Sequence, residues 1–449
     1  MSGMDQARRR AWRGGAVLLS AGLAVASMPA ARSQPAGEPW QPVQVISTAG
    51  PGEGVGLAAT TVLDDGSTLA IHEQAGAFWQ SRREPGGDWT EPQRIEPPDA
   101  DINGTGSAAV SPAGTVWLTY SVATQDGDEA HVVRMSADQP ETVLVVSSTQ
   151  SAGSVTVDRD GDLLFTLQGN SREGAWYGDE NSTTLTRLAP RTRFFSFQPH
   201  SWALGPGDRV ARAAFDYDDE QIEVRRVVPG APRAQVASRW QAPTQGIDYL
   251  YADVRIGWRG DGSQVVAWSE PDSRPRYRDV VRLARRAPGA TWGPARVVGR
   301  SRADSSNPTY ELRMSLTDAG AYVAWAQPGQ GLDDTRLVGF FVRPGHAPVR
   351  QLIAGPRQVG YYASLGGFTV ATDAVGRLLV VWDSVPPGSE GYKTRVAEGH
   401  VRGELARQLL FTDAQSRGLL RPGGEATVIA RVQSPTDPDD EQLLSRSTD

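Results

Sequence analysis

The sequence contains no cysteine, and lysine is nearly absent as well. The lack of cysteine excludes disulfide bonds, thiolate metal sites, a cysteine nucleophile and a lipid-modified N-terminal cysteine. Lys393 is the single lysine, so arginine supplies the other 44 of the 45 basic residues. These arginines are dispersed along the chain, and they therefore indicate no basic binding face.

Long helical patterns are also scarce, whereas turn-forming residues are abundant. The chain has 49 glycines and 31 prolines among its 449 residues. Its hydrophobic runs have the length of strands and are too short for good helices. This composition predicts an all-β protein with many short strands joined by turns.

One unit recurs through the chain: a short strand, a tight turn that ends in glycine, and a strongly apolar strand. Residues 256–268, IGWRGDGSQVVAW, are an example. The turn glycines of the strong copies are Gly66, Gly114, Gly161, Gly207, Gly262, Gly320 and Gly376. A period near 50 residues with about four strands per unit is typical of a β-propeller blade.

A weaker eighth copy contains Gly424, so the repeats predict a single propeller of eight four-stranded blades. Seven blades are the alternative, if the weak copy only completes a neighbouring blade. We name the strands of a blade a to d, from the axis of the ring outward. The glycine turn then joins strand a to strand b.

Both ends of the chain resemble halves of one hairpin. Residues 79–95, WQSRREPGGDWTEPQRI, contain a complete copy, with a Pro-Gly-Gly turn between strands c and d. The C-terminal residues 441–447 match its first strand, and the N-terminal residues 38–46 match its second. We therefore expect the two ends to pair within the last blade and to close the ring, which leaves no open sheet edge.

Tryptophans recur at fixed blade positions. Trp268, Trp325 and Trp382 end the b strands of three successive blades, where His72 and Tyr120 stand in the first two. Such a row can form a ligand platform. Large aromatic side chains repeated at one blade position more often fill the space between neighbouring blades, and we favour this packing role.

The N-terminus has the pattern of an export signal. A basic segment with four arginines precedes the apolar residues 14–26, which are too few for a membrane span. The predicted organisation is a secretion signal over 1–26, a flexible linker over 27–37 and the propeller over 38–449. Removing the signal takes away four Arg and one Asp, and this changes the formal charge from −7 to −10. An acidic, secreted monomer is expected, without nucleic acid binding or membrane insertion after cleavage.

Motifs for cofactors and metals are missing from the sequence. The five histidines are scattered, and no P-loop, Gly-x-Gly-x-x-Gly or Gly-x-Ser-x-Gly segment occurs. Residues 158–162, DRDGD, resemble the start of a calcium loop but lack the distal glutamate, and Asp-Gly is an ordinary tight turn. We expect no cofactor and no metal.

The repeated pattern resembles a known group of proteins. A Trp-x-x-Pro that opens an outer strand, followed by Asp-x-x-Gly-x-x-x-Val-x-Trp, resembles secreted β-propellers of GC-rich actinobacteria, loosely grouped with the sialidase-like superfamily. The resemblance covers nearly all of the mature chain and implies the fold. Sialidase-type Asp boxes are incomplete here: the segment LTDAGAYVAW keeps Asp318 and Gly320, but Leu316 replaces the serine. No catalytic residue follows from the resemblance.

Loop lengths predict where a ligand binds. The a–b and c–d turns are short, whereas the b–c and d–a connections are long and polar, and both long types emerge on one face, which we call the mouth. Tyr beside Asp and Asn suits stacking and hydrogen bonding to a polar ligand such as a glycan. The predicted binding residues, all near the ends of d–a connections, are Asp101, Asn103, His200, Tyr249, Tyr251, Asn307, Tyr310, Tyr361 and Tyr362.

Three functions remain open from the sequence. The favoured one is a secreted, non-catalytic propeller that binds a glycan or an envelope protein. The second is a sialidase-like glycoside hydrolase or lyase, which needs two carboxylates about 5–10 Å apart at the mouth. Its candidate carboxylates are Asp101, Asp216, Asp218, Asp248, Asp253 and Asp304. A Tyr310–Glu311 nucleophile pair is disfavoured, because neighbours in a regular strand point to opposite faces. The third is a scaffold for docking envelope proteins.

Overall fold

A computed structural model shows how the chain folds. The chain divides into two units, Met1–Ala36 and Gly37–Asp449, and every described residue belongs to the second. The described residues are 40–50, 53–95, 102–125, 127–135, 140–147, 153–158, 160–167, 174–188, 200–207, 209–216, 219–229, 234–241, 253–271, 277–302, 310–327, 335–359, 365–386, 388, 391–412, 414–420, 425–433 and 441–448. The predicted signal and linker lie outside them.

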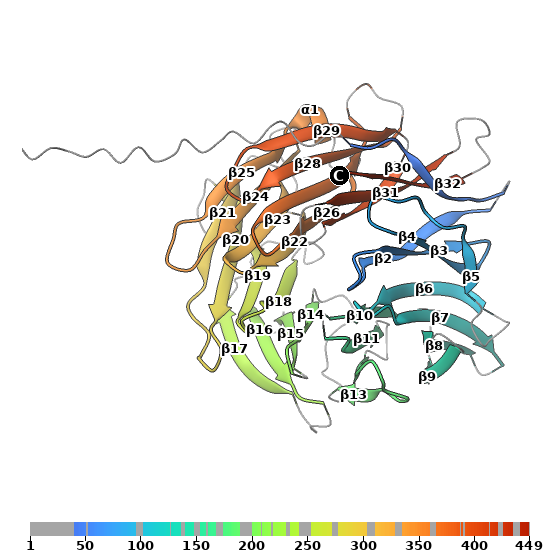
Figure 1. Ribbon diagram of the computed structural model, residues 1–449. Coiled ribbons are helices and arrows are strands. Elements are labelled where there is room, and N and C mark those ends of the chain that lie inside the picture. The colour runs from blue at the N-terminus through green and yellow to red at the C-terminus, as the bar shows by residue number, and fades with distance from the viewer. Residues whose placement is uncertain are drawn as a thin grey trace, which may run out of the picture. The chain divides into compact units, whose positions relative to one another are not determined.

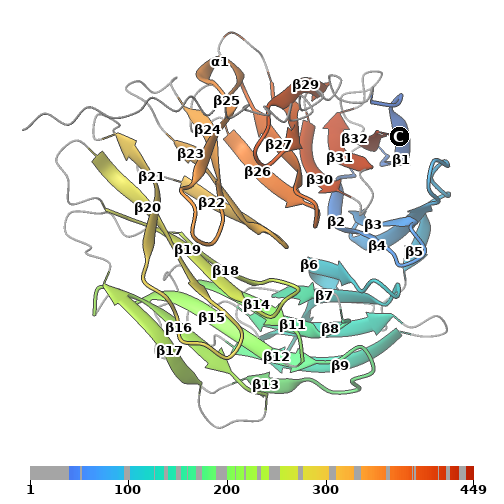
Figure 2. The same ribbon diagram turned by 60° about the vertical axis from the view of Figure 1, so that its left-hand side comes forward.

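The second unit is an eight-bladed β-propeller of four-stranded antiparallel sheets, as predicted (Figures 1 and 2). Blade 1 contains β2 (Val55–Val62), β3 (Thr68–Gln74), β4 (Ala77–Arg83) and β5 (Gln93–Ile95). Blade 2 contains β6 (Ile102–Val110), β7 (Val116–Thr124), β8 (Gly127–Met135) and β9 (Pro140–Ser147). Blade 3 contains β10 (Ser154–Val157), β11 (Leu163–Leu167), β12 (Gly174–Gly178) and β13 (Thr186–Leu188). Blade 4 contains β14 (His200–Gly205), β15 (Arg209–Asp216), β16 (Gln221–Val227) and β17 (Gln235–Gln241).

The second half of the ring repeats this arrangement. Blade 5 contains β18 (Val254–Trp258), β19 (Gln264–Pro271), β20 (Tyr277–Arg286) and β21 (Arg296–Arg302). Blade 6 contains β22 (Tyr310–Thr317), β23 (Gly320–Gln327), β24 (Arg336–Val342) and β25 (Val349–Ala354), and the one-turn helix α1 (Pro356–Val359) follows it. Blade 7 contains β26 (Leu365–Thr372), β27 (Arg377–Ser384), β28 (Lys393–His400) and β29 (Leu405–Thr412). Blade 8 contains β30 (Ala414–Leu420), β31 (Ala426–Gln433), β32 (Glu441–Ser447) and β1 (Gln44–Thr48).

The two ends of the chain pair as predicted. Strand β1 is the outer strand of blade 8 and runs antiparallel to β32, with Gln44 opposite Ser445 and Val45 opposite Leu444. Figure 2 shows β1 beside β32. The backbone N–H of Gln41 adds a bond of 2.8 Å to the carbonyl of Ser447. The prediction of eight blades closed by the termini is therefore confirmed.

The a–b turns explain the glycine repeat. Six of the seven strong-copy glycines have positive φ angles, for example 83° at Gly66 and 93° at Gly376. Residues with a Cβ rarely adopt this conformation, so glycine is the favoured residue there. The seventh, Gly320, opens β23 directly. Gly424 lies outside the described residues, between β30 and β31.

The hydrophobic core lies between the blades. Eight clusters of buried residues occur in the described part of the chain, and each joins two successive blades around the ring. Trp268, Trp325 and Trp382 are at most 1% exposed and belong to the clusters between blades 4 and 5, 5 and 6, and 6 and 7. His72 and Tyr120 are also fully buried. The predicted packing role of this row is confirmed.

Candidate functional site

The nine residues predicted to bind a ligand are only partly described. Of the nine, His200 alone has a described side chain: it is half-buried, begins β14 and lies opposite Ala214. The backbones of Asn103 and Tyr310 belong to β6 and β22. The remaining six, Asp101, Tyr249, Tyr251, Asn307, Tyr361 and Tyr362, lie outside the described residues. The binding role of all nine stays a prediction.

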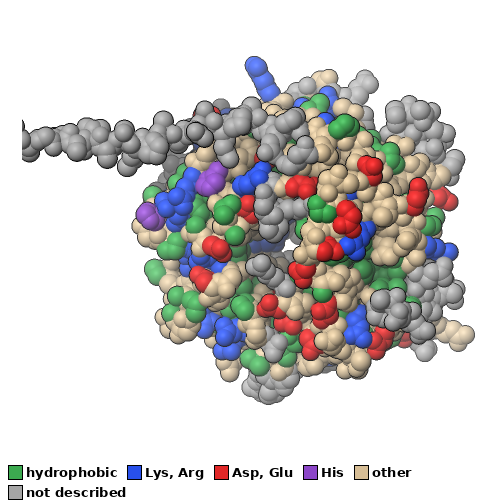
Figure 3. Space-filling model, viewed as in Figure 1, with side chains coloured by type: hydrophobic (Ala, Val, Ile, Leu, Met, Phe, Trp, Pro, Cys, Tyr) green, Lys and Arg blue, Asp and Glu red, His purple; other side chains and the backbone are tan. Residues whose placement is uncertain are grey.

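Four charged side chains gather at the mouth ends of two innermost strands. Asp253 precedes β18 and Arg255 lies on it, while Glu311 and Arg313 lie near the start of β22. We call these four residues the inner-strand cluster. Their side chains are 17–33% exposed, so water reaches all of them partly. Figure 3 shows an opening near the centre of the ring with acidic and basic side chains beside it.

Asp253 links blade 5 to blade 6. Its carboxylate pairs with the guanidinium of Arg255, with Nη1 2.5 Å from Oδ1. It also accepts the backbone N–H of Leu312 at 2.9 Å, from the next blade. Burial raises the pKa of Asp253, while the positive charges of Arg255 and Arg313 act in the opposite direction. Most of the hydrogen-bonding capacity of this carboxylate is therefore used within the protein.

Arg313 links blade 6 to blade 7 in a similar way. Its Nε donates to the carbonyl of Phe368 on β26 at 3.1 Å. Its guanidinium carbon also lies 5.5 Å from the centroid of the Phe368 ring, a cation–π contact. The cluster is thus held by three successive blades, which makes its geometry rigid.

Glu311 differs from the other members in its backbone and in its bonding. Its φ is +52°, an unusual value for a residue with a side chain, and the pairing of β22 with β23 shifts register between Tyr310 and Arg313. Its Oε2 is buried and has no hydrogen-bond partner in the described part of the chain, although Arg313 Nη2 lies 3.8 Å away. Burial raises the pKa of Glu311 and the charge of Asp253 adds to the rise, whereas Arg313 and a hydrogen bond from the backbone N–H of Phe368 to the carboxylate oppose it.

This irregularity removes the basis of one prediction. A Tyr310–Glu311 pair is disfavoured only in a regular strand, where successive side chains point to opposite faces. The register shift at these residues breaks that alternation. The direction of the Tyr310 side chain lies outside what the structure describes.

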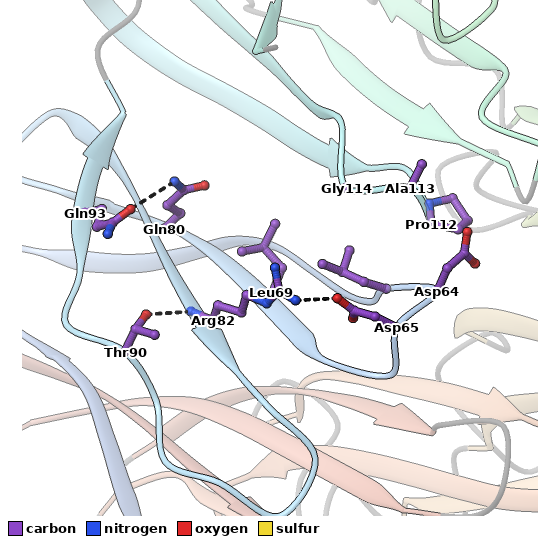
Figure 4. Close-up of a pocket in the computed structure, with 11 residues that line it drawn as sticks. Asp64, Asp65, Leu69, Gln80, Arg82, Thr90, Gln93, Pro112, Ala113 and Gly114 are labelled. Atoms are coloured by element: carbon purple, nitrogen blue, oxygen red, sulfur yellow. Dashed lines mark hydrogen bonds and ion pairs between the residues drawn. The ribbon is translucent and has the colours of Figure 1, made fainter. Parts of the chain in front are cut away.

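A second candidate site lies at the opposite face, beside the a–b turns of blades 1 and 2 (Figure 4). It is an open cavity of about 540 Å³, within the size range of ligand pockets. The turns 63–67 and 111–115 form one wall and are joined by a bond of 2.9 Å from the N–H of Asp64 to the carbonyl of Pro112. The lining residues are Leu63, Asp64, Asp65, Leu69, Gln80, Arg82, Thr90, Gln93, Pro112, Ala113 and Gly114. We call it the blade 1–2 cavity.

The structure also shows what the calcium-like turn does. Asp158 Oδ1 accepts the backbone N–H groups of Asp160 at 2.9 Å and Asp162 at 3.0 Å, so its carboxylate caps the turn. Burial, followed by the charge of Asp162, raises the pKa of Asp158 to about 6. Among the residues that the structure describes, no three His, Asp or Glu side chains are grouped as a metal ion requires. Within the same residues, no helix has the length and apolar character to cross a membrane.

Sequence reasoning found only part of these sites. Asp253 was among the candidate carboxylates, but Arg255, Glu311 and Arg313 were not assigned to the mouth. A signal was present, because charged residues alternate with apolar ones in two predicted innermost strands. The blade 1–2 cavity lies at the face with the short turns, where no site was expected.

Comparisons with known proteins add little about activity. No protein-family profile matches the chain, and no curated protein sequence aligns with it significantly. Prolyl oligopeptidase B from Galerina marginata is 11% identical with a TM-score of 0.49, and the match covers 84% of this chain and 55% of that chain. Oligogalacturonate lyase from Vibrio parahaemolyticus is 9% identical with a TM-score of 0.46, over 90% of this chain and 97% of that chain.

A protein from Lactobacillus plantarum is 14% identical with a TM-score of 0.44, over 81% of this chain and 96% of that chain. This chain therefore spans about half the length of the prolyl oligopeptidase and nearly all of the other two. At identities and TM-scores this low, the matches support no argument about activity or substrates.

Proposed function

We propose that the protein is a secreted, non-catalytic β-propeller that binds a glycan at its mouth. The observation that carries this proposal is the buried Oε2 of Glu311, which lacks a hydrogen-bond donor among the described residues. An unpaired carboxylate oxygen is costly unless a ligand or water donates to it. The hydroxyl groups of a sugar are suitable donors.

The charges around Glu311 also favour a neutral, hydroxyl-rich ligand. Asp253 is paired with Arg255, and Arg313 lies beside Glu311, so the four formal charges cancel. A ligand with a large net charge therefore meets no matching excess of the opposite sign. Two guanidinium groups and two carboxylates still offer donors and acceptors in fixed positions.

The predicted binding residues adjoin this cluster in the chain. Tyr251 precedes Asp253 by two residues, and Tyr310 is next to Glu311. Tyr361 and Tyr362 lead into β26, which carries the contacts of Arg313. Aromatic side chains beside hydrogen-bonding groups are the usual composition of a polar-ligand site.

The test is a glycan array with the mature protein, followed by calorimetric titration of the strongest ligand. Glu311→Gln replaces an acceptor oxygen and removes the charge, and it should weaken binding at least tenfold. Asp318→Asn is the matched control, because Asp318 is exposed near the other end of the same strand. A variant Glu311→Gln that binds as tightly as the parent would contradict the proposal.

A glycoside hydrolase is the second candidate, and one observation favours it. Asp253 and Glu311 lie close enough for the charge of Asp253 to raise the pKa of Glu311. Carboxylates with perturbed pKa values are common in active sites. Incubating the array ligands with the protein and measuring released sugar distinguishes the candidates. Turnover that disappears in Glu311→Gln would establish the enzyme and end the non-catalytic proposal.

A further inference from the structure

Polar residues interrupt an apolar face between blades 1 and 2. Leu69 and Ile71 on β3 belong to the hydrophobic cluster between these blades. Arg82 lies opposite Leu69, and Gln80 lies opposite Ile71, so their side chains share that face. Gln93 on the outer strand β5 lies opposite Gln80. The core of the blade interface thus ends in the polar wall of the blade 1–2 cavity.

Three other blades have an apolar side chain at the position of Gln80, whereas blade 4 has Arg225 there. The residue five places after the turn glycine is Ile71 in blade 1, and its partner on the c strand is Gln80. The c-strand residue at the corresponding position is Val132 in blade 2, Leu283 in blade 5 and Val396 in blade 7. Each of these three belongs to an inter-blade hydrophobic cluster. A glutamine here forgoes that packing and keeps polar groups at the cavity.

The cavity offers unused donors and acceptors. Gln80 Nε2 donates to Gln93 Oε1 at 3.5 Å, which leaves the other half of each amide open. Thr90 Oγ1 accepts the N–H of Arg82 at 3.0 Å, and its own hydroxyl proton remains available. The carboxylate of Asp64 has no partner in the described part of the chain. Figure 4 shows these groups around one space, with Leu69 and Pro112 beside them.

The charges of the cavity disfavour an anion. Among the described residues that line the cavity, Arg82 is the only cationic one, and its guanidinium contacts Asp65 and also Glu84, with Nε 3.2 Å from Oε1. Hydrogen bonds from Ser67, followed by Arg82, lower the pKa of Asp65, so this carboxylate stays charged at neutral pH. Asp64 adds a further negative charge. An acidic ligand would therefore meet net repulsion.

We infer that the blade 1–2 cavity is a second binding site, which takes one or two units of a neutral carbohydrate. Sugar hydroxyls both donate and accept, which matches the mixture of open amide, hydroxyl and carboxylate groups. The C–H faces of a sugar suit the apolar wall of Leu69 and Pro112. The site goes beyond the proposed function, because it lies at the other face and shares no residue with the inner-strand cluster.

Calorimetric titration of the full chain tests this inference. The neutral probes are cellotriose, mannotriose and galactotriose, and the acidic probe is the trisaccharide of glucuronic acid. At least one neutral probe should bind, and the acidic probe should bind at least tenfold more weakly. Two variants remove the site in different ways: Gln80→Leu restores the residue type of blade 5, and Ala113→Trp fills the cavity. Each should weaken the neutral probe at least tenfold.

Two control variants separate this site from the mouth. Gln235→Leu makes the same chemical change at an exposed position of blade 4, and it should leave the affinity for the neutral probe unchanged. Glu311→Gln weakens the mouth site, so the neutral-probe binding that remains in this variant should come from the cavity and should fall at least tenfold when Ala113→Trp is added. If Glu311→Gln abolishes the signal and the two cavity variants do not, the ligand binds at the mouth and the inference is overturned. Absence of binding by all three neutral probes, or equal binding of the acidic probe, also overturns it. Should Gln80→Leu fail to fold, Ala113→Trp decides, because Ala113 is exposed.

Discussion

The guanidinium group of Arg83 in blade 1 contacts the carboxylate of Glu425 in blade 8. Arg83 is only 1% exposed, and it also donates to the hydroxyl groups of Ser447 and Thr427. The side chain of Trp89 adds a bond of 2.7 Å to Ser445. The ring is therefore closed both by strand pairing within blade 8 and by polar contacts from blade 1 to blade 8.

Replacing Arg83 by methionine should destabilise the protein by about 3 kcal/mol, because it leaves the partners of a buried ion pair without their donor. Urea unfolding measures this change. Arg82→Met is the matched control: Arg82 pairs with Asp65, but both side chains are more than 40% exposed. The Arg82→Met variant should lose less than about 1 kcal/mol of unfolding free energy. Equal losses for the two variants would contradict the role given to burial.

Deleting residues 38–46 should cause aggregation or a large drop in melting temperature. The deletion removes most of β1 and exposes the edge of β32. Light scattering and thermal unfolding measure both effects. Deleting residues 27–37, the predicted linker, is the control and should change neither. A protein without residues 38–46 that melts like the parent would show that closure does not need β1.

Trp268→Ala should destabilise the fold by about 4 kcal/mol. The indole is fully buried between blades 4 and 5, and its Nε1 donates to Glu270 at 2.7 Å. The variant therefore leaves a cavity and removes one of the hydrogen bonds to Glu270, which also pairs with Arg282. Ligand binding should be lost only as far as the protein unfolds. A Trp268→Ala variant with the parent melting temperature but no binding would assign the tryptophan row to the ligand.

Gly339→Ala should cost about 3 kcal/mol. A Cβ at this position on β24 would lie 2.0 Å from the hydroxyl oxygen of Tyr322, which is fully buried. Gly355→Ala is the matched control, because a Cβ there meets nothing within 4 Å. Chemical denaturation compares the two. Combining Gly339→Ala with Tyr322→Ala should cost less than the sum of the single changes, since the clash is then absent.

His72 should make the protein less stable in mild acid. Burial lowers the pKa of His72 to about 4 from the usual 6.5, and neither ring nitrogen has a hydrogen-bond partner in the described chain. The unfolded chain therefore takes up this proton first as the pH falls. The neutral state of His72 contributes fully to the free energy of unfolding above pH 6.5. This contribution decreases as the pH falls toward 4, by about 3 kcal/mol in total.

The measurement is the urea midpoint of His72→Leu and of the parent at several pH values between 7 and 4. The variant should lose less stability than the parent across this range. His346→Leu, at an exposed position, should follow the parent. A His72→Leu variant whose stability falls as steeply as that of the parent would assign the acid sensitivity to other groups.

Much of the fold could be predicted because its determinants are local and repeated. The glycine after strand a needs only its own turn, and that turn recurs once per blade. Strand β1 could be assigned to the last blade because a complete hairpin at residues 79–95 shows what the termini lack. The burial of Trp268, Trp325 and Trp382 followed from the same repetition, since equal blade positions have equal surroundings.

The candidate sites depend on contacts that no repeat specifies. Asp253 accepts the N–H of Leu312, which is 59 residues further along the chain, and Arg313 reaches Phe368 at a separation of 55. The bulge at Glu311 breaks strand alternation, so the periodicity of the sequence does not give the side-chain directions there. The blade 1–2 cavity exists because the a–b turn of blade 2 meets the a–b turn and the outer strands β4 and β5 of blade 1 around polar side chains. Repetition sets the structure of each blade, whereas these sites arise where particular blades meet, and only the tertiary structure brings their residues together.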